Sequence, residues 1–138
     1  CRGATDWTAH MHMNHMNIPV TDVVAAADFL TTHFAMTLSA PATKKFAMLR
    51  DDAGMVLVLS NFESITESQL PSAFHVGFMM DSRAEVDMVH QKLTAAGYTC
   101  DPPRLMHFSW TFYMTAPGGY TLEVQKWEGR PVKPDTAL

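Results

Sequence analysis

The chain has 138 residues, of which 47% are hydrophobic and 17% charged, a size and composition typical of one globular domain rather than of a disordered or fibrous chain. Its formal net charge is −4 and it has no cluster of Lys or Arg, which argues against nucleic acid or an anionic membrane as a partner. No apolar run reaches the roughly 18 residues that a membrane-spanning helix needs.

The two ends of the chain are set apart from the predicted fold. Residues 1–12, CRGATDWTAHMH, lack the apolar centre of a signal peptide, and we interpret them as an upstream extension or a remnant of cloning. His10 and His12 in this stretch can bind metal adventitiously, so they are kept out of the site prediction. Residues 128–138 are expected to form an irregular tail. The two cysteines of the chain do not make a disulfide framework, which favours a cytoplasmic location.

The first half of the chain shows the pattern of a strand, a helix and three further strands. His15 and its neighbours alternate with apolar residues, which indicates a strand, and Asp22 is placed to cap a helix with one apolar face. A tight-turn sequence, Asp-Asp-Ala-Gly, precedes a segment that is apolar on both faces, as in a central strand. The predicted elements are a strand over 14–20, a helix over 23–34, and strands over 36–39, 45–50 and 55–59.

The second half repeats this order after a polar linker over residues 63–72. Ser82 and Glu85 form a capping-box pattern at the start of a helix, and Gly97 is placed to end that helix. The sequence Ala-Pro-Gly-Gly indicates a turn between the last two strands. The predicted strands of this half cover residues 74–80, 98–100, 108–115 and 120–127.

The two halves also resemble each other in sequence. FAMLRDDAGMVLVL corresponds to TFYMTAPGGYTLEV, and HMNIPVTD corresponds to HVGFMMDS. A repeat of about 60 residues with one helix per unit indicates internal duplication, with chance similarity of two short β-rich segments as the alternative. We therefore predict an α+β single domain over residues 13–127, made of two βαβββ modules (about 13–62 and 73–127) that form a curved mixed sheet around an internal cavity.

Three stretches carry a resemblance to a known family. HMNIPVTD before a helix, FHVGFMMDSRAEVDMVHQKLTAAG and the closing APGGYTLEV resemble the vicinal oxygen chelate superfamily of glyoxalases, extradiol dioxygenases and bleomycin resistance proteins. The resemblance extends from Met13 to about Trp127. It implies a divalent metal ion (Fe, Zn, Mn or Ni) bound by His15, His75 and Glu123. It also implies a homodimer, in which His15 and the other two ligands can come from different chains.

The resemblance departs from the family pattern at one ligand position. Aligning Gly54 with Gly119 places Val58 opposite Glu123, where glyoxalase I enzymes typically have an acid. Three ligands with open positions better resemble the fosfomycin-modifying enzymes or the extradiol dioxygenases, although neither match is complete. The resemblance therefore leaves lyase, thiol transferase and dioxygenase chemistry open.

The alternation of the strands supports the same metal site without reference to the family. His15, His75 and Glu123 each lie opposite the apolar set of their strand, so all three project from the face away from the helices. Two imidazoles and a carboxylate with open positions suit a catalytic divalent metal. Such a metal would polarise a substrate oxygen or lower the pKa of a bound water.

Further candidates lie near the second module's central hairpin. Glu123 and His107 are the predicted catalytic residues, with His107 as an acid or base. Phe108, Trp110 and Tyr113 are the predicted lining of a substrate pocket. The same aromatic residues support an alternative, a metal-free small-molecule or antibiotic-binding protein similar to the bleomycin resistance proteins. A structural module with a filled interior is a further alternative.

Overall fold

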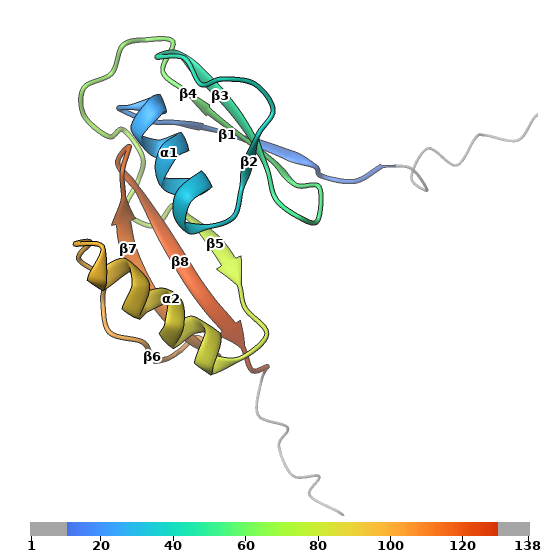
Figure 1. Ribbon diagram of the computed structural model, residues 1–138, viewed down its shortest axis with the longest axis vertical. Helices are drawn as coiled ribbons and strands as arrows, with labels where there is room; N and C mark the ends of the chain where they lie inside the picture. The colour runs from blue at the N-terminus through green and yellow to red at the C-terminus, as the bar shows by residue number, and fades with distance from the viewer. Residues whose placement is uncertain (1–10, 130–138) are drawn as a thin grey trace, which may run out of the picture. The chain divides into compact units, whose positions relative to one another are not determined.

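The computed structural model describes residues 11–129 (Figure 1). Most of the predicted extension (1–12) and of the predicted tail (128–138) lies outside the described residues. The chain divides into two compact units, one ending at Thr66 and the other beginning at Glu67. This division falls inside the predicted linker, and the union of both modules in one domain stays a prediction. None of the helices within residues 11–129 is long and apolar enough to cross a membrane.

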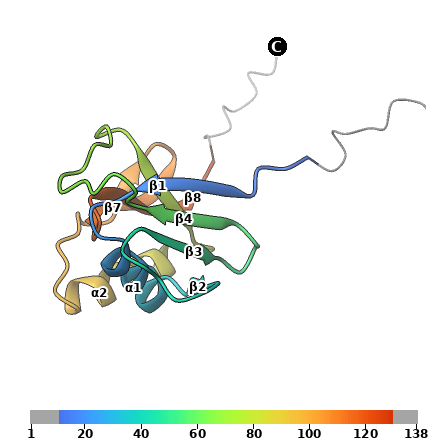
Figure 2. The same ribbon diagram turned by 90° about the horizontal axis from the view of Figure 1, so that it is seen from above.

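The first unit is a four-stranded mixed sheet with one helix. Its sheet order is β1-β4-β3-β2, in which β1 runs parallel to β4 and the other neighbours are antiparallel (Figure 2). The predicted central position of the last strand is thereby confirmed, because β4 pairs on both sides. The elements are β1 (His15–Pro19), α1 (Val23–His33), β2 (Thr37–Leu38), β3 (Phe46–Arg50) and β4 (Val56–Ser60).

Helix α1 packs its apolar face on this sheet. It begins after Asp22, whose side chain accepts a hydrogen bond of 3.0 Å from the backbone N of Ala25, as predicted. Leu30 on the helix and Leu49 and Leu59 on the strands are fully buried between the two layers. Burial of each such side chain stabilises the unit by about 2 kcal/mol.

The second unit repeats the architecture of the first. Its sheet order is β5-β8-β7-β6, with β5 parallel to β8. The predicted capping box is confirmed, because Ser82 accepts from the backbone N of Glu85 while the Glu85 side chain accepts from the backbone N of Ser82. The elements are β5 (His75–Met79), α2 (Arg83–Ala95), β6 (Arg104–Met106), β7 (Ser109–Ala116) and β8 (Tyr120–Trp127).

The predicted α+β class with two βαβββ modules is confirmed, and one predicted strand is wrong. Residues 98–100 form no strand, and Cys100 makes only an isolated bridge to Met114. The following prolines, Pro102 and Pro103, have no N–H to donate, so the ladder cannot continue through them. Regular pairing with β7 begins only at Arg104, after the prolines.

Candidate metal site on the second sheet

The two faces of the second sheet carry different kinds of side chain. Toward α2, the ring of Phe112 contacts His90, with ring centroids 5.2 Å apart, and the Trp110 indole donates a hydrogen bond of 2.8 Å to Asp87. The face away from α2 carries polar residues at every second position of β7 and β8. Three of them are almost fully buried, namely Ser109, Thr111 and Glu123. Buried polar groups are costly, so their clustering on one face indicates a functional surface.

Glu123 lies at the centre of this face and is only 5% exposed. Its Oε2 accepts a hydrogen bond of 2.7 Å from the Thr111 hydroxyl. Tyr113 lies directly across from it on β7. Burial raises the pKa of Tyr113 to about 12, and the hydrogen bond to Glu123 and its negative charge add to the rise while Arg104 opposes it. The phenol therefore stays protonated at neutral pH and is available as a donor.

His75 faces Glu123 from the neighbouring strand β5. Its Nδ1 lies 3.0 Å from the backbone oxygen of Ala73. A carbonyl oxygen only accepts, so Nδ1 carries the hydrogen in this contact. The other ring nitrogen, Nε2, lies 3.5 Å from Oε1 of Glu123. In the neutral ring, a lone pair on Nε2 would face a carboxylate oxygen. This arrangement is favourable only with a proton or a cation between the two atoms.

The geometry of the pair fits a shared metal ion. Two ligand atoms that each lie about 2.1 Å from a tetrahedral metal are about 3.4 Å apart. The observed separation between Nε2 of His75 and Oε1 of Glu123 is 3.5 Å. The bond from Nδ1 to the Ala73 carbonyl also fixes the ring orientation and tautomer, as outer partners of metal-binding histidines usually do. The donor set therefore suits a divalent ion such as zinc or iron(II).

The third predicted ligand, His15, belongs to the first unit. It is exposed on β1, and its Nδ1 lies 2.9 Å from the side-chain oxygen of Asn14. The strand registers give His15 and His75 equivalent positions, because each lies two residues before the partner of Val58 or Glu123. This confirms the predicted correspondence of those two positions. The structure brings His75 and Glu123 together, and no three His, Cys, Asp or Glu side chains form a metal cluster within residues 11–129.

His107 and Phe108 lie at the far end of the hairpin from this pair. Both occupy the turn between β6 and β7, with positive φ angles of 52° and 61°. Strand β7 begins at Ser109, so His107 lies before the strand that carries Tyr113. The role of His107 as an acid or base stays a prediction.

Two residues of the predicted aromatic pocket lie on different faces of the second sheet. Trp110 and Tyr113 are three residues apart on one strand, so their side chains point to opposite faces. Trp110 packs against α2, where the guanidinium carbon of Arg83 lies 4.9 Å from the centre of its ring. Of the two predicted pocket residues on β7, Tyr113 lies on the face of Glu123 and Trp110 does not. The pocket itself stays a prediction.

Sequence reasoning assigned no role to the residues that surround Glu123. Thr111, Gln125 and Gly77 all lie on its face, as the strand registers show. The signal was the polar alternation along β7 and β8. It identified the face but could not show which polar residues would be buried there.

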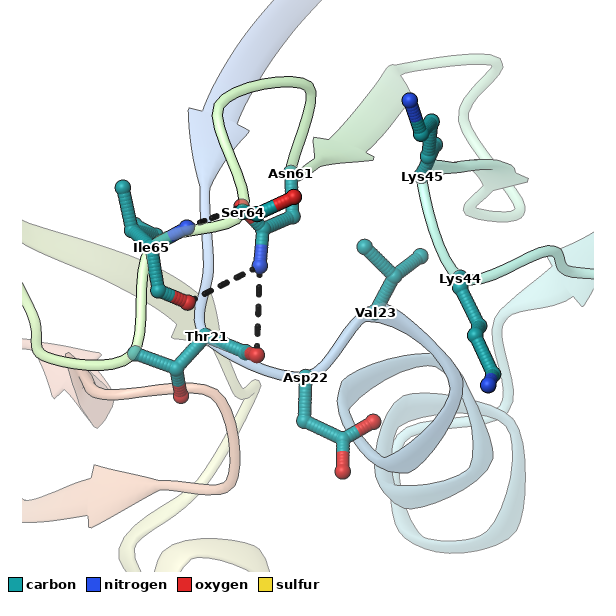
Figure 3. Close-up of a pocket in the computed structure, with 8 residues that line it drawn as sticks. All are labelled: Thr21, Asp22, Val23, Lys44, Lys45, Asn61, Ser64 and Ile65. Atoms are coloured by element: carbon teal, nitrogen blue, oxygen red, sulfur yellow. Dashed lines mark hydrogen bonds between the residues drawn. The ribbon is translucent and has the colours of Figure 1, made fainter.

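A separate hollow of about 400 Å³ lies in the first unit, beside the start of α1 (Figure 3). Asn61 ties its wall together, because its side chain donates to the backbone oxygens of Thr21 and Ile65 and accepts from the Ile65 N–H. Lys44 and Lys45 also line the hollow, but Figure 3 shows their side chains pointing away from each other. The polar groups here close a loop, and they do not converge on a ligand.

Comparison with known proteins gives a consistent family. The family model described as Glyoxalase/Bleomycin resistance protein/Dioxygenase superfamily matches residues 12–124. A structure described as a possible glyoxalase from Bacillus cereus is 41% identical, with a TM-score of 0.75, and the match covers 83% of this chain and 98% of that one.

Two more distant structures share the fold. Lactoylglutathione lyase from Agrobacterium tumefaciens is 17% identical, with a TM-score of 0.68 and coverage of 83% of this chain and 92% of that one. A glyoxalase/bleomycin resistance protein/dioxygenase from Nocardioides is 21% identical, with a TM-score of 0.67 and coverage of 91% and 90%. No curated protein matches the chain.

Proposed function

Because the chain belongs to the Glyoxalase/Bleomycin resistance protein/Dioxygenase superfamily, we propose that it is an enzyme that acts on a small molecule with a divalent metal bound by His75 and Glu123. The observation that carries this proposal is the position of Nε2 of His75, 3.5 Å from Oε1 of a buried carboxylate. A carboxylate that is 5% exposed and has no cationic Lys or Arg bonded to it within residues 11–129 is expensive to keep charged. A bound cation would remove that cost.

The chain's own residues would prepare the site for such an ion. Thr111 holds one oxygen of Glu123 with its hydroxyl, which leaves Oε1 directed toward His75. The Ala73 carbonyl holds the imidazole in the tautomer that presents Nε2. Tyr113, protonated at neutral pH, provides a donor beside the same carboxylate. When bound, the metal supplies Lewis-acid stabilisation of negative charge on a substrate oxygen.

A histidine and a carboxylate leave room for a third protein ligand. We assign this role to His15, whose place in its own unit is equivalent to that of His75. Three protein ligands with open positions are typical of catalytic rather than structural metal sites. We also propose that the protein acts as a homodimer, in which His15 is contributed by the same chain or by a second copy. A cytoplasmic location stays a prediction.

The direct test is metal analysis of protein that lacks residues 1–12, because His10 and His12 would otherwise contribute adventitious binding. After loading with zinc and dialysis, the protein is expected to retain one zinc ion per chain. His75→Ala is expected to abolish this retention, and His15→Ala is expected to weaken it. His107→Asn is the matched control, because His107 lies in the turn before β7 and is not a proposed ligand, and it should retain the metal.

Three outcomes would overturn all or part of the proposal. Retention of zinc at full stoichiometry in the His75→Ala variant would exclude the proposed pair as the metal site. Protein that binds no divalent metal but retains a small-molecule ligand would instead support the metal-free, sequestering alternative. Loss of metal with His75→Ala but not with His15→Ala would keep the pair and reject His15 as the third ligand.

A further inference from the structure

A gap in front of Glu123 arises from the absence of a side chain at residue 77. Gly77 is the register partner of Glu123 on the neighbouring strand. A Cβ atom built at Gly77 would lie 4.0 Å from Oε1 of Glu123 and 3.8 Å from Nε2 of Gln125. Both distances are ordinary van der Waals contacts. Gly77 is not among the glycines with positive φ, so the backbone does not require glycine here. What glycine provides is open space beside the carboxylate.

The Gln125 amide is oriented so that its donor borders this gap. Its Oε1 accepts a hydrogen bond of 2.8 Å from the hydroxyl of Ser109, which is 1% exposed. A buried hydroxyl anchors the oxygen end of the amide, so the nitrogen end is turned toward Gly77. Nε2 has no hydrogen-bond partner among residues 11–129, although an amide nitrogen carries two N–H donors. The amide is therefore held in place by its oxygen, and its nitrogen has no acceptor in the described part of the chain.

We propose that Gln125 binds the substrate, donating from Nε2 to an acceptor oxygen of a molecule that occupies the gap over Gly77. The ligand group that Nε2 contacts is a hydrogen-bond acceptor, such as a carbonyl, carboxylate or oxyanion oxygen. This inference rests on the proposed function, because the metal holds the other part of the ligand. Since Nε2 can only donate, an ammonium group at this position would be rejected.

The charge around the gap favours the same ligand class. Arg104, the register partner of Thr111 on the adjacent strand β6, acts on Tyr113 as a nearby positive charge. A metal ion at His75 and Glu123 would add further positive charge beside the gap. An anionic or strongly polarised oxygen is therefore favoured over a neutral apolar group. The first unit lacks this arrangement, because the equivalent of Gly77 is Asn17, whose side-chain oxygen already accepts from Ser60.

Oxalate is a suitable probe, because it carries adjacent carboxylate oxygens. Oxalate binding to zinc-loaded protein lacking residues 1–12 would be measured by isothermal titration calorimetry, with zinc content checked afterwards. Gln125→Met keeps the length of the side chain but removes the donor, and it is expected to weaken oxalate binding about tenfold. Gly77→Leu fills the gap and is expected to weaken oxalate binding more. Zinc affinity should be unchanged in Gln125→Met.

The control is Gln91→Met, the same substitution at an exposed position of α2. It should bind oxalate like the wild type. Equal oxalate affinity in the wild type and Gln125→Met, with zinc bound in both, would overturn the role of Gln125 and leave the proposed metal site intact. Zinc-loaded wild type that does not bind oxalate would also overturn it. A wild type that binds no zinc would overturn the proposed function itself, and this inference with it.

Discussion

The two units have the same scaffold but differ at one buried position on the central strand. In the first sheet, Asn17, Val58 and Met48 are aligned across three neighbouring strands. In the second, Gly77 and Tyr113 flank Glu123 in the same register. The two central residues are equally buried, with Val58 7% and Glu123 5% exposed. The duplicated fold therefore tolerates either a valine or a carboxylate here, and its chemistry depends on which one is present.

The neighbours of the central residue differ in a related way. Around Val58, the polar groups satisfy each other, because Ser60 donates a hydrogen bond of 2.7 Å to Asn17. Around Glu123, Thr111 and Tyr113 serve the carboxylate, and the Gln125 amide is left with a free donor. The comparison indicates that the first unit closes this place with internal hydrogen bonds. In the second unit, the proposal assigns this place to an external group.

The largest expected effect comes from removing the charge that distinguishes the second unit. Glu123→Gln keeps the shape of the side chain and an oxygen that can accept from Thr111, but an amide is a poor metal ligand. We expect zinc affinity to fall more than 100-fold, about 2.7 kcal/mol. Competition with a chelator of known affinity would measure the loss. An affinity within threefold of the wild type would remove the basis of the comparison.

The reverse substitution tests whether the first unit can accept the same charge. Val58→Glu would bury a carboxylate without the donors that Thr111 and Tyr113 supply in the second unit. We expect it to lower the free energy of unfolding by about 2–3 kcal/mol in metal-free protein. Val58→Thr keeps nearly the same volume and adds an uncharged polar group, so it is the control for polarity without charge. Urea unfolding would measure both variants, and an unchanged stability in Val58→Glu would show that the two environments are more alike than their neighbours suggest.

A smaller effect is expected from the hydroxyl that supports the carboxylate. Thr111→Val keeps the shape of the side chain and removes the 2.7 Å hydrogen bond to Glu123. Loss of such an outer partner is expected to lower zinc affinity about tenfold. Thr115→Val, at an exposed position on the same strand and face, is the control and should bind zinc normally. If both variants bound zinc like the wild type, the carboxylate would not need the support of Thr111.

The N-terminal caps of the two helices allow a further comparison of the two units, by their contributions to the free energy of unfolding. Asp22→Ala removes a single cap from α1, whereas Ser82→Ala removes half of a reciprocal capping box from α2. Each substitution is expected to lower the free energy of unfolding by about 1 kcal/mol. Thermal unfolding would measure both. A difference of several kcal/mol between the two variants would contradict the view that the units are equivalent scaffolds.

The smallest effect is expected at the exposed ion pair of the second unit, where Arg83 donates to Glu128. The hydrogen bond from Arg83 lowers the pKa of Glu128 below its usual value of 4.5. The pair therefore contributes stability above that value and loses it as the pH falls through the lowered pKa. Glu128→Gln should lower the melting temperature slightly at pH 7, and the difference from the wild type should disappear in acid. A difference that grew in acid would contradict this sign.

The fold could be predicted from the sequence because its signals are local. Alternation in strands, the caps at Asp22 and Ser82 and the glycine-containing turns each involve only neighbouring residues. The segment over residues 98–100 was wrong because its β-forming residues outweighed the two prolines that follow. Whether these residues pair with β7 depends on how far the chain can follow the edge of that strand before the prolines. This is a contact between distant residues, and local sequence patterns do not predict it.

Alternation along the strands predicted which face of the second sheet carries the candidate site, but it did not predict the contacts within the site. Period two placed His75 and Glu123 on one face, and the structure brings their side chains within 3.5 Å. The structure also places Trp110 and Tyr113 on opposite faces. Alternation along the strand already implied that these two residues could not line the same pocket. Thr111 and Gln125 were missed because their importance comes from burial and hydrogen bonds across strands. Those contacts follow from the register of β7 with β8 rather than from spacing along the chain.

The position of a bound metal is the most direct measurement. Crystals soaked in zinc would be examined for anomalous scattering at the zinc absorption edge. We predict a peak about 2.0–2.2 Å from both Nε2 of His75 and a carboxylate oxygen of Glu123. A peak elsewhere, with the His75 and Glu123 side chains in direct contact and no ion between them, would contradict the account.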